Sequence, residues 1–380
     1  MKKIVIIGAN SFQNPLILKA KEMGFETHVF AWKDGSIGER TADYFYPISI
    51  VEREKVLKEC RRIQPDAVAS IGSDLAMLTV NYVAEQLGLP GNSMECTIMS
   101  TNKYEMRKAF QAEGVSVPKF AEADLDTKPE DLEGFTLPVI VKPTDRSGSR
   151  GITKVEAWGD FSKAVRFSVE NSFEKKAIVE EYLTGEEYSC ECISYRGRHH
   201  FLAFTKKFTT EAPHFIETGH LEPSGLSPLQ TERAKKEVFQ ALDALKVENG
   251  ASHTEFRIDE NDTVRIIEVG ARMGGDCIGS DLVQISTGYD FVRMVIDVAS
   301  GKEPDFTLGG EKKVAYVHFI FRKEDLELLE RLKGECPEKI RFVSELEEIR
   351  EGEVTDSSTR FGYFIAAFDT MEQVKEYINL

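Results

Sequence analysis

Short apolar runs alternate with amphipathic runs of helical length over the first hundred residues. The strand-like runs are KIVIIG, THVFAW and DAVASIG, and the helical runs are PLILKAKEMG, EREKVLKECRRI and LAMLTVNYVAEQLG. The first and last helical runs end at Gly24 and Gly88, and glycine is a common helix stop. Strands that alternate with helices of this length predict a parallel sheet covered on both faces. We therefore expect a doubly wound α/β domain over residues 1–100.

The pattern changes after residue 100. A helical run precedes two strands, and a loop rich in serine and glycine lies between these strands. In chain order the segments are NKYEMRKAFQAEG, LPVIVKP, TDRSGSRG and KAIVEEYL. Most later signals are strands with isolated helices, which is typical of an α+β region. The 380 residues allow two or three domains of ~100–200 residues each. We expect a small subdomain over residues 101–184 and a larger one, with a C-terminal lobe, over residues 185–380.

Composition limits the classes of partner. The formal net charge is -16 and the pI is near 5.1. This acidic balance argues against a nucleic acid or an anionic membrane as partner, because both attract basic patches. The N-terminal apolar run is too short for a signal-peptide core, and no segment approaches the ~20 apolar residues of a membrane span. The six cysteines are scattered, so we expect reduced thiols in a soluble cytoplasmic protein. Cys190 and Cys192 fit alternate positions of a strand better than a zinc site.

Lys142 ends an apolar strand and precedes the Ser- and Gly-rich loop Ser147–Gly151. Glycines let backbone N–H groups approach an anion, and a lysine adds a positive charge, so this segment is suited to hold phosphate. The spacing is not that of a P-loop, and an ordinary turn is the alternative interpretation.

Glu255 and Glu268 lie in two strands that are joined by the polar turn Asp259–Asp262. A hairpin can place their carboxylates side by side, which is unfavourable unless a cation lies between them. Carboxylate oxygens suit Mg²⁺, especially where substrate phosphates complete the coordination. Two solvent-facing acids are the alternative, but Glu268 stands in the apolar strand VRIIEVG, where an unpaired charge is costly.

Arg272 follows Glu268 by four residues. An arginine beside a metal site can hold a phosphoryl or carboxylate group through two hydrogen bonds, although a surface ion pair is the alternative.

The segment EEYLTGEEYS carries Glu180 and Glu181 at the end of an apolar strand. Gly185 allows a tight turn before Glu187. A strand crossing of this kind can present backbone groups to the edge of a base and a carboxylate to ribose hydroxyls.

These pieces, in this order, resemble the ATP-grasp superfamily over essentially the whole chain. In that family two lysines, a glycine-rich loop, an E-E-x-x-x-G-x-E hinge and two metal-binding acids line a nucleotide cleft. The resemblance implies an N-terminal parallel-sheet domain, a central lid subdomain and a C-terminal α+β lobe that binds ATP. It also implies Mg²⁺, for which Mn²⁺ is a substitute. The implied nucleotide-binding residues are Lys103, Lys142, Ser147, Gly148, Ser149, Gly151, Glu180, Glu181, Tyr182, Leu183 and Glu187; Glu255 and Glu268 are the implied metal ligands.

One position departs from the family pattern. Many ATP-grasp enzymes read E-x-N-x-R at the second metal-binding acid, whereas this chain reads Glu268-Val-Gly270-Ala-Arg272. Because Gly270 has no amide oxygen, coordination of a second metal ion would need a water, a backbone carbonyl or another side chain.

Within the superfamily, the stretch FTKKFTTEAPHFIETGHLEPSGL is similar to the bacterial L-amino-acid ligases and carnosine-synthase-like enzymes. The matching residues are Lys206, Glu217, His220 and Pro223. The resemblance implies catalytic roles for Arg272, Glu217, His220 and Lys206. From the residues alone, His220 is equally compatible with a loop histidine that caps a turn.

The resemblance implies an enzyme that activates a carboxylate as an acyl phosphate and couples it to an amine, with release of ADP and phosphate. It is compatible with a homodimer. There are three alternative functions. A purine-pathway or bicarbonate-activating ATP-grasp enzyme is the nearest alternative, and a nucleotide-binding regulatory protein without turnover is the second. A dinucleotide-dependent oxidoreductase is disfavoured because the turn at Gly8 lacks the G-x-G-x-x-G fingerprint.

Overall fold

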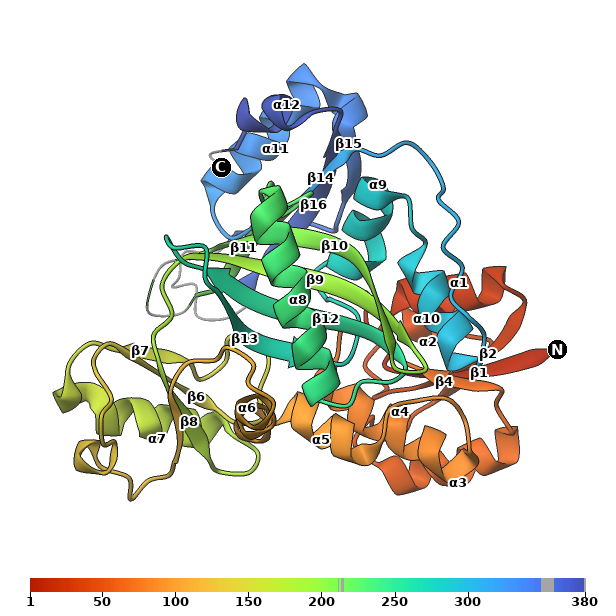
Figure 1. Cartoon of the computed structure of the whole chain (residues 1–380). Helices are drawn as coiled ribbons and strands as arrows, with labels where there is room; N and C mark the ends of the chain where they lie inside the picture. The colour runs from red at the N-terminus through yellow and green to blue at the C-terminus, as the bar shows by residue number, and fades with distance from the viewer. Residues whose placement is uncertain (211, 213–214, 350–358, 379–380) are drawn as a thin grey trace.

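The computed structural model describes residues 1–210, 212, 215–349 and 359–378. Its strands form three sheets, one from each of the segments 1–100, 101–184 and 185–380 (Figure 1). The N-terminal sheet is parallel, and the other two are antiparallel. This arrangement is the mixed α/β and α+β fold that the sequence predicts.

The N-terminal sheet has the strand order β3-β2-β1-β4, with helices on both faces. Its elements are β1 (Lys2–Ile7), α1 (Asn14–Glu22), β2 (Phe25–Phe30), α2 (Gly38–Thr41), β3 (Tyr44–Tyr46), α3 (Arg53–Ile63), β4 (Ala67–Ala69) and α4 (Asp74–Leu87). The predicted strands and helices are confirmed, and Gly88 ends α4 with a left-handed φ of 67°. Alternate residues of β1 enter two cores: Val5 packs with α3 and α4, whereas Ile4 packs with α1.

Residues 1–100 do not complete this domain. Helix α10 (Phe291–Ala299) packs against α1 and β4, and its residue Val292 belongs to the same core as Ile4 (Figure 1). The prediction that the N-terminal domain ends near residue 100 therefore leaves out this helix. The physical reason is that a parallel sheet must be covered on both faces, and the distant helix covers part of the face beside α1.

The second sheet has the order β5-β8-β6-β7 and carries helix α7. Helix α5 (Met94–Thr101) and helix α6 lead into it from the N-terminal domain. The other elements are α6 (Lys103–Ala112), β5 (Phe120–Ala123), η1 (Pro129–Asp131), β6 (Val139–Pro143), β7 (Thr153–Val155), η2 (Trp158–Asp160), α7 (Phe161–Asn171) and β8 (Ala177–Glu181). The Ser- and Gly-rich loop connects β6 to β7 at one end of this sheet.

The largest sheet has eight strands in the order β13-β12-β9-β10-β11-β14-β16-β15. Its strands are β9 (Glu186–Tyr195), β10 (Arg198–Thr209), β11 (Glu217–Glu222), β12 (Gly250–Ile258), β13 (Val264–Gly270), β14 (Val314–Ile320), β15 (Ile340–Val343) and β16 (Gly362–Phe368). The remaining helices are α8 (Pro228–Ala244), η3 (Ile278–Leu282), α9 (Val283–Thr287), α11 (Lys323–Glu335), η4 (Pro337–Lys339) and α12 (Met371–Lys375). The C-terminal lobe continues this sheet through β14, β16 and β15.

The two faces of the largest sheet differ in character. Helix α8 lies across one face, where Cys190, Phe204 and Phe256 form an apolar core with it (Figure 1). Side chains of a strand alternate between faces, so the neighbours Glu191 and Glu255 point to the opposite face. The hairpin of β12 and β13 pairs Glu255 directly with Glu268, as predicted.

All six cysteines are free thiols, as expected for a reduced protein, and Cys190 and Cys192 occupy alternate positions of β9. Among the helices in the described part of the chain, none has the length and apolarity required to cross a bilayer.

Gly185 generates the first prediction. It has a φ of 106°, and a Cβ atom there would lie 2.1 Å from the carbonyl oxygen of Ile258. Gly197 also has a positive φ, 73°, but a Cβ atom there would meet no atom within 4 Å. We expect Gly185→Ala to lower the free energy of unfolding by about 3 kcal/mol more than Gly197→Ala, because overpacking adds to the shared backbone strain. Thermal unfolding of the two variants measures this, and equal Tm values would contradict it.

Candidate active site

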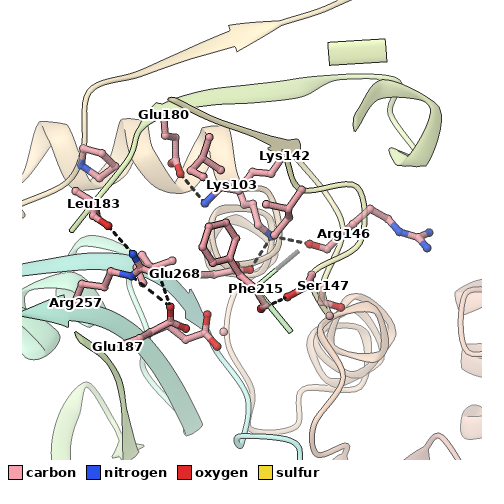
Figure 2. A pocket seen from close by; sticks show the side chains of 18 of the residues that line it. Lys103, Lys142, Arg146, Ser147, Glu180, Leu183, Glu187, Phe215, Arg257 and Glu268 are labelled. Carbon is pink, nitrogen blue, oxygen red and sulfur yellow. Dashed lines mark hydrogen bonds and ion pairs between the residues drawn. The ribbon is translucent and has the colours of Figure 1, made fainter. Parts of the chain in front are cut away.

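A cleft with about 1020 Å³ of empty space, part of it open to solvent, lies between the small and the large antiparallel sheet (Figure 2). Most residues that the sequence predicts for a nucleotide site line it. They are Lys103, Lys142, Ser147, Gly148, Ser149, Glu180, Glu181, Tyr182, Leu183, Glu187, Glu217, Glu255, Glu268 and Arg272. Gly151, Lys206 and His220 are not part of its wall.

Lys103 connects the two sides of the cleft. It is the first residue of α6, a helix that begins there because the Asn102 side chain accepts hydrogen bonds from the backbone N–H groups of Tyr104 and Glu105. The Lys103 Nζ donates to the Arg146 carbonyl at 2.6 Å and to Glu268 Oε1 at 2.8 Å (Figure 2). A phosphate near this ammonium would therefore also lie near the loop and near one of the paired acids.

Lys142 is held by a buried carboxylate. Its Nζ lies 2.6 Å from Glu180 Oε2, and Arg107 Nε lies 2.5 Å from Glu180 Oε1. Burial lowers the pKa of Lys142, although Glu180 opposes this effect. Burial also opposes ionisation of Glu180, but Arg107 and Lys142 outweigh it and lower the pKa of that carboxyl. Glu180 is thus a buried counter-ion of Lys142, and Arg107 is a site residue that the sequence reasoning missed.

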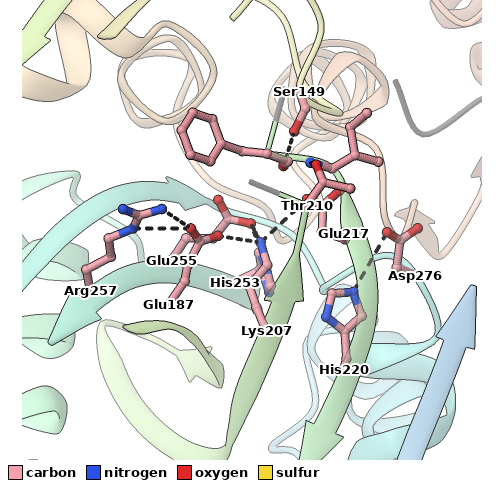
Figure 3. A network of polar contacts seen from close by, with 12 residues as sticks. Ser149, Glu187, Lys207, Thr210, Glu217, His220, His253, Glu255, Arg257 and Asp276 are labelled. Carbon is pink, nitrogen blue, oxygen red and sulfur yellow. Dashed lines mark hydrogen bonds and ion pairs between the residues drawn. The ribbon is translucent and has the colours of Figure 1, made fainter. Parts of the chain in front are cut away.

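The loop Ser147–Gly151 reaches over the cleft toward the segment before β11. Ser149 has a φ of 56°, and its Oγ donates to the Phe215 carbonyl at 3.2 Å (Figure 3). Gly151 lies behind the loop, where its φ is 74° and a Cβ atom would lie 2.8 Å from Pro143 Cγ. Gly151 therefore contributes to the shape of the loop. Ser147, Gly148 and Ser149, which line the cleft, are the loop residues that a phosphate in the cleft could contact.

The hinge from Glu180 to Glu187 is fixed by Arg257, a second residue that sequence reasoning missed. The Arg257 guanidinium donates to the Leu183 carbonyl at 2.6 Å and to Glu187 Oε2 at 3.0 Å (Figure 2). Arg257 lies on β12, two residues from Glu255, and so points to the same face of the sheet. One cation thus holds both a backbone carbonyl and a carboxylate of the hinge at the cleft.

Glu255 and Glu268 lie side by side, and each is paired with a lysine. Glu268 contacts Lys103, and Glu255 forms a close ion pair with Lys207 and lies 3.3 Å from His253 Nε2 (Figure 3). Burial opposes ionisation of Glu255, but Lys207 and His253 hold its pKa well below the usual range. Burial also disfavours a charged His253, yet Glu191 and Glu255 raise its pKa to about 9.

These acids fit a Mg²⁺ site that the nucleotide completes. Carboxylate oxygens are the donors that Mg²⁺ prefers, and the two acids are cross-strand partners on the cleft wall. Among the described residues, no group of three or more His, Cys, Asp or Glu side chains is close enough to hold a metal ion by itself. The protein would therefore contribute Glu255 and Glu268, and phosphate oxygens and water would supply the other ligands.

Lys207, and not Lys206, reaches the acids of the cleft. Lys206 is the register partner of Tyr188, faces away from Glu255, and pairs with the exposed Glu186 at 2.8 Å. The structure therefore places Lys206 away from the cleft, contrary to its predicted position, and places the neighbouring Lys207 among the acids. The physical reason is strand alternation, since adjacent lysines on β10 must point to opposite faces. The Lys207 Nζ lies 3.3 Å from Glu187 Oε1 and 3.6 Å from Glu217 Oε1, besides its contact with Glu255 (Figure 3).

The pKa of Glu217 is shifted in the direction opposite to that of Glu255. Burial raises its pKa, and the nearby Asp276 and Glu255 also raise it, while Lys207 and Arg360 oppose them. Arg360, another residue that the sequence did not reveal, lies 3.7 Å from Glu217 Oε2 and pairs with both Asp276 oxygens at 2.8 Å. Glu217 is thus a carboxyl group on the cleft wall with a raised pKa.

His220 lies near Asp276, which is the partner of Arg360, but its side chain is buried. Its Nε2 is 3.9 Å from Asp276 Oδ2, beyond hydrogen-bond distance (Figure 3). Burial lowers the pKa of His220 to about 4, against the pull of Asp276, so the imidazole is neutral at pH 7. The turn-cap interpretation does not hold, because His220 lies inside β11. The geometry supports a role beside Glu217 more than direct contact with a nucleotide.

The buried position of Lys207 generates the second prediction. We expect Lys207→Met to lower the free energy of unfolding by about 3 kcal/mol, because it removes the buried cation that Glu255, Glu187 and Glu217 share. The other partners of these acids, which are His253, Arg257 and Arg360, offset only part of this loss. The matched control is Lys206→Met on the other face, whose partner is exposed and whose loss costs at most about 1 kcal/mol. Thermal unfolding at pH 7 compares the two variants. A Tm of Lys207→Met at or above that of Lys206→Met would contradict the assignment.

Comparison with known proteins agrees with this geometry. Residues 135–281, which span the loop, the hinge and both acids, match the family described as the ATP-grasp domain. The chain is 28% identical over 284 residues to the alanine–anticapsin ligase of Bacillus subtilis strain 168. That match covers 67% of this chain and 58% of the relative, so the chain spans less than two thirds of the length of this relative.

Solved structures show the same fold over nearly the whole chain. The L-amino acid ligase from Bacillus licheniformis has a TM-score of 0.79 at 23% identity, and the match covers 99% of this chain and 96% of that one. The N5-carboxyaminoimidazole synthetase from Staphylococcus aureus complexed with ADP has a TM-score of 0.78 at 17% identity, with 99% and 95% covered. Residues 135–281 therefore match the ATP-grasp domain, and nearly the whole chain has the fold of these solved structures.

Proposed function

We propose that this chain is an ADP-forming ligase that joins the carboxylate of one amino acid to the amine of another. In the first step a carboxylate oxygen attacks the γ-phosphorus of ATP, the bond from that phosphorus to the bridging oxygen breaks, and ADP leaves. In the second step the amine nitrogen attacks the carbonyl carbon of the acyl phosphate. Phosphate leaves, and the amine gives up a proton. The observation that carries the proposal is the cleft, where two lysines, an arginine and the paired acids Glu255 and Glu268 face one space.

One set of cleft residues is assigned to the phosphates of the nucleotide, and another set to its base and ribose. Lys103 and Lys142 are placed to bind its phosphates, and the hinge that Arg257 holds is placed to receive its base and ribose. The loop Ser147–Gly151 covers the terminal phosphate and excludes water, which would otherwise hydrolyse an acyl phosphate. Mg²⁺, when bound at Glu255 and Glu268, would neutralise charge on the phosphates during transfer. Arg272, which lines the same wall, would stabilise the oxyanion of the second step.

Glu217 is the group that we assign to the amine. Its raised pKa makes it a better proton acceptor than an ordinary carboxylate, and it lies on the cleft wall beside the acids. The neutral His220 behind it offers a nitrogen that can donate or accept a hydrogen bond. This arrangement supports a second substrate with an amino group.

The assignment of amino-acid substrates rests on the relatives. The curated relative named above is an alanine–anticapsin ligase, and an L-amino acid ligase is among the solved structures with this fold. The fold alone also fits a purine-pathway enzyme, because the N5-carboxyaminoimidazole synthetase matches with nearly the same TM-score. Retention of both acids and of Arg272 in the cleft opposes the third option, a regulatory protein without turnover.

The test is Mg²⁺-dependent release of ADP and phosphate over a panel of paired amino acids, with mass spectrometry of the products. Turnover that needs two amino acids and yields their dehydrated conjugate would establish the proposed function. Turnover with bicarbonate and no amino acid would replace it by the nearest alternative. ATP binding without turnover under any of these conditions would favour the regulatory protein.

Glu268 generates the third prediction. We expect Glu268→Gln to lower kcat by at least about 100-fold, because the amide removes a negative charge that the metal site requires. The matched control is Glu260→Gln, an exposed acid in the turn of the same hairpin, which should keep wild-type turnover. ADP release at saturating Mg²⁺ measures both, and near-normal rates for Glu268→Gln would rule out this metal assignment.

Glu217 generates a prediction about pH. A proton acceptor must be ionised, and the pKa of Glu217 is raised, so kcat should increase as the pH rises through that pKa. Glu217→Gln should lower kcat by about 100-fold and remove this acidic limb, because the amide cannot accept the proton. The kcat–pH profiles of the wild type and the variant measure it. An unchanged acidic limb in the variant would assign the titration to another group.

A further inference from the structure

An ion pair joins the N-terminal domain to the wall of the cleft. Asp74 is the first residue of α4, which follows β4 at the carboxyl end of the parallel sheet. Its Oδ1 accepts from Arg272 Nε at 2.8 Å, and its Oδ2 accepts from Arg272 Nη2 at 3.0 Å. Two parallel hydrogen bonds of this kind fix the plane of the guanidinium as well as its position.

Gly270 makes room for this pair. A Cβ atom built on Gly270 would lie 2.9 Å from Asp74 Oδ1 and 3.0 Å from Arg272 Cζ. A side chain at position 270 would therefore press on the ends of the Asp74 and Arg272 side chains, and at least one of them would have to shift. The space that an asparagine side chain at position 270 would enter is thus already taken by the Asp74 carboxylate of the N-terminal domain.

The pair leaves Arg272 able to bind an anion. An arginine has five N–H donors, and the described contacts use three of them, two for Asp74 and one for the Met273 carbonyl at 3.3 Å. The two others remain for a phosphate or an oxyanion in the cleft that Arg272 lines. Glu255 and Glu268 also attract this guanidinium, so without Asp74 they would draw it toward the paired acids.

We propose that Asp74 is a positioning residue of the ligase, which acts from the N-terminal domain by holding Arg272 in the orientation that catalysis requires. The inference rests on the proposed function, since Arg272 is there the group that stabilises the oxyanion. It assigns the N-terminal domain a direct part in the reaction and explains why position 270 is a glycine.

The surroundings of the Asp74–Arg272 pair favour a role in orienting Arg272 over a role in stabilising the domain contact. The domain contact does not depend on it, because α10 packs on α1 and the backbone N–H of Gly72 already donates to the Met273 carbonyl at 3.3 Å. A buried ion pair also contributes little net stability, since the cost of removing two charges from water offsets their attraction. Orientation of Arg272 is the property that the pair does provide.

The kinetic test uses Asp74→Ala, Arg272→Ala and the double variant. We expect Asp74→Ala to lower kcat by about 100-fold, because a small displacement of a catalytic group has an effect of that size. The dissociation constant of ATP should change by less than about threefold, since Lys103 and Lys142 are untouched. In the Arg272→Ala background, Asp74→Ala should have no further effect on kcat. Independent, multiplicative losses in the double variant would overturn the proposal, as would a loss of ATP affinity that parallels the loss of kcat.

The matched control is Ser73→Ala. Ser73 precedes Asp74 and caps α4, because its side chain accepts a hydrogen bond from the Ala76 backbone N–H at 3.3 Å. Among the described residues, Ser73 makes no hydrogen bond to Arg272. Its replacement weakens the start of the same helix and should leave kcat within about twofold of the wild type. An equal loss of kcat in Ser73→Ala and Asp74→Ala would show that helix stability, and not the pair, is responsible.

A measurement without substrate separates this inference from the proposed function. Gly270→Ala should lower Tm in the presence of Asp74 and should have a much smaller effect in the Asp74→Ala background. The contact with Asp74 is then absent, and Arg272 is no longer held in place by the pair and can move away from the new methyl group. If the wild type has no ligase turnover but this coupling is found, the proposed function fails and the packing of Asp74 against Arg272 stands. If Gly270→Ala has the same effect on Tm in both backgrounds, the inference fails, whatever the substrates are.

Discussion

The pairing of β12 with β13 is the constraint on which the site depends. It places Glu255 directly opposite Glu268 on the face of the large sheet that α8 does not cover. Two neighbouring carboxylates repel each other, and this repulsion must be compensated. The compensation comes from Lys103 on one side and from Lys207 with His253 on the other. The positions of these cations follow from the need to neutralise that pair.

Charge compensation also connects the three sheets. Lys103 links the second sheet's loop to β13, Arg257 links β12 to the hinge, and Arg272 links the end of β13 to the N-terminal domain. Each contact crosses a boundary between segments that are far apart in sequence. A bound nucleotide would replace some of these partners, since its phosphates compete for the same cations. Under the proposed function, ligand charge and domain arrangement would therefore be coupled through these cations.

Much of the fold could be predicted because local patterns dominate it. The alternation of strands and helices over residues 1–100, the glycine that ends α4, and the hairpin between Glu255 and Glu268 are all local features, and all three are confirmed. The extent of the N-terminal domain was not predictable in the same way. Helix α10 is remote in sequence from β1, and no local signal indicates that it covers the same sheet as α1.

The sequence by itself determined the types of residue in the cleft and their order, because lysines, glycines and acids at these spacings are readable along the chain. Only the tertiary structure decided which of them meet. Strand register placed Lys207 and not Lys206 among the acids, and packing put Gly151 and His220 behind the wall. The docking of the N-terminal domain brought Asp74 to Arg272. The reason is that a side chain's face and its distant partners depend on pairing and packing between segments, which local sequence does not encode.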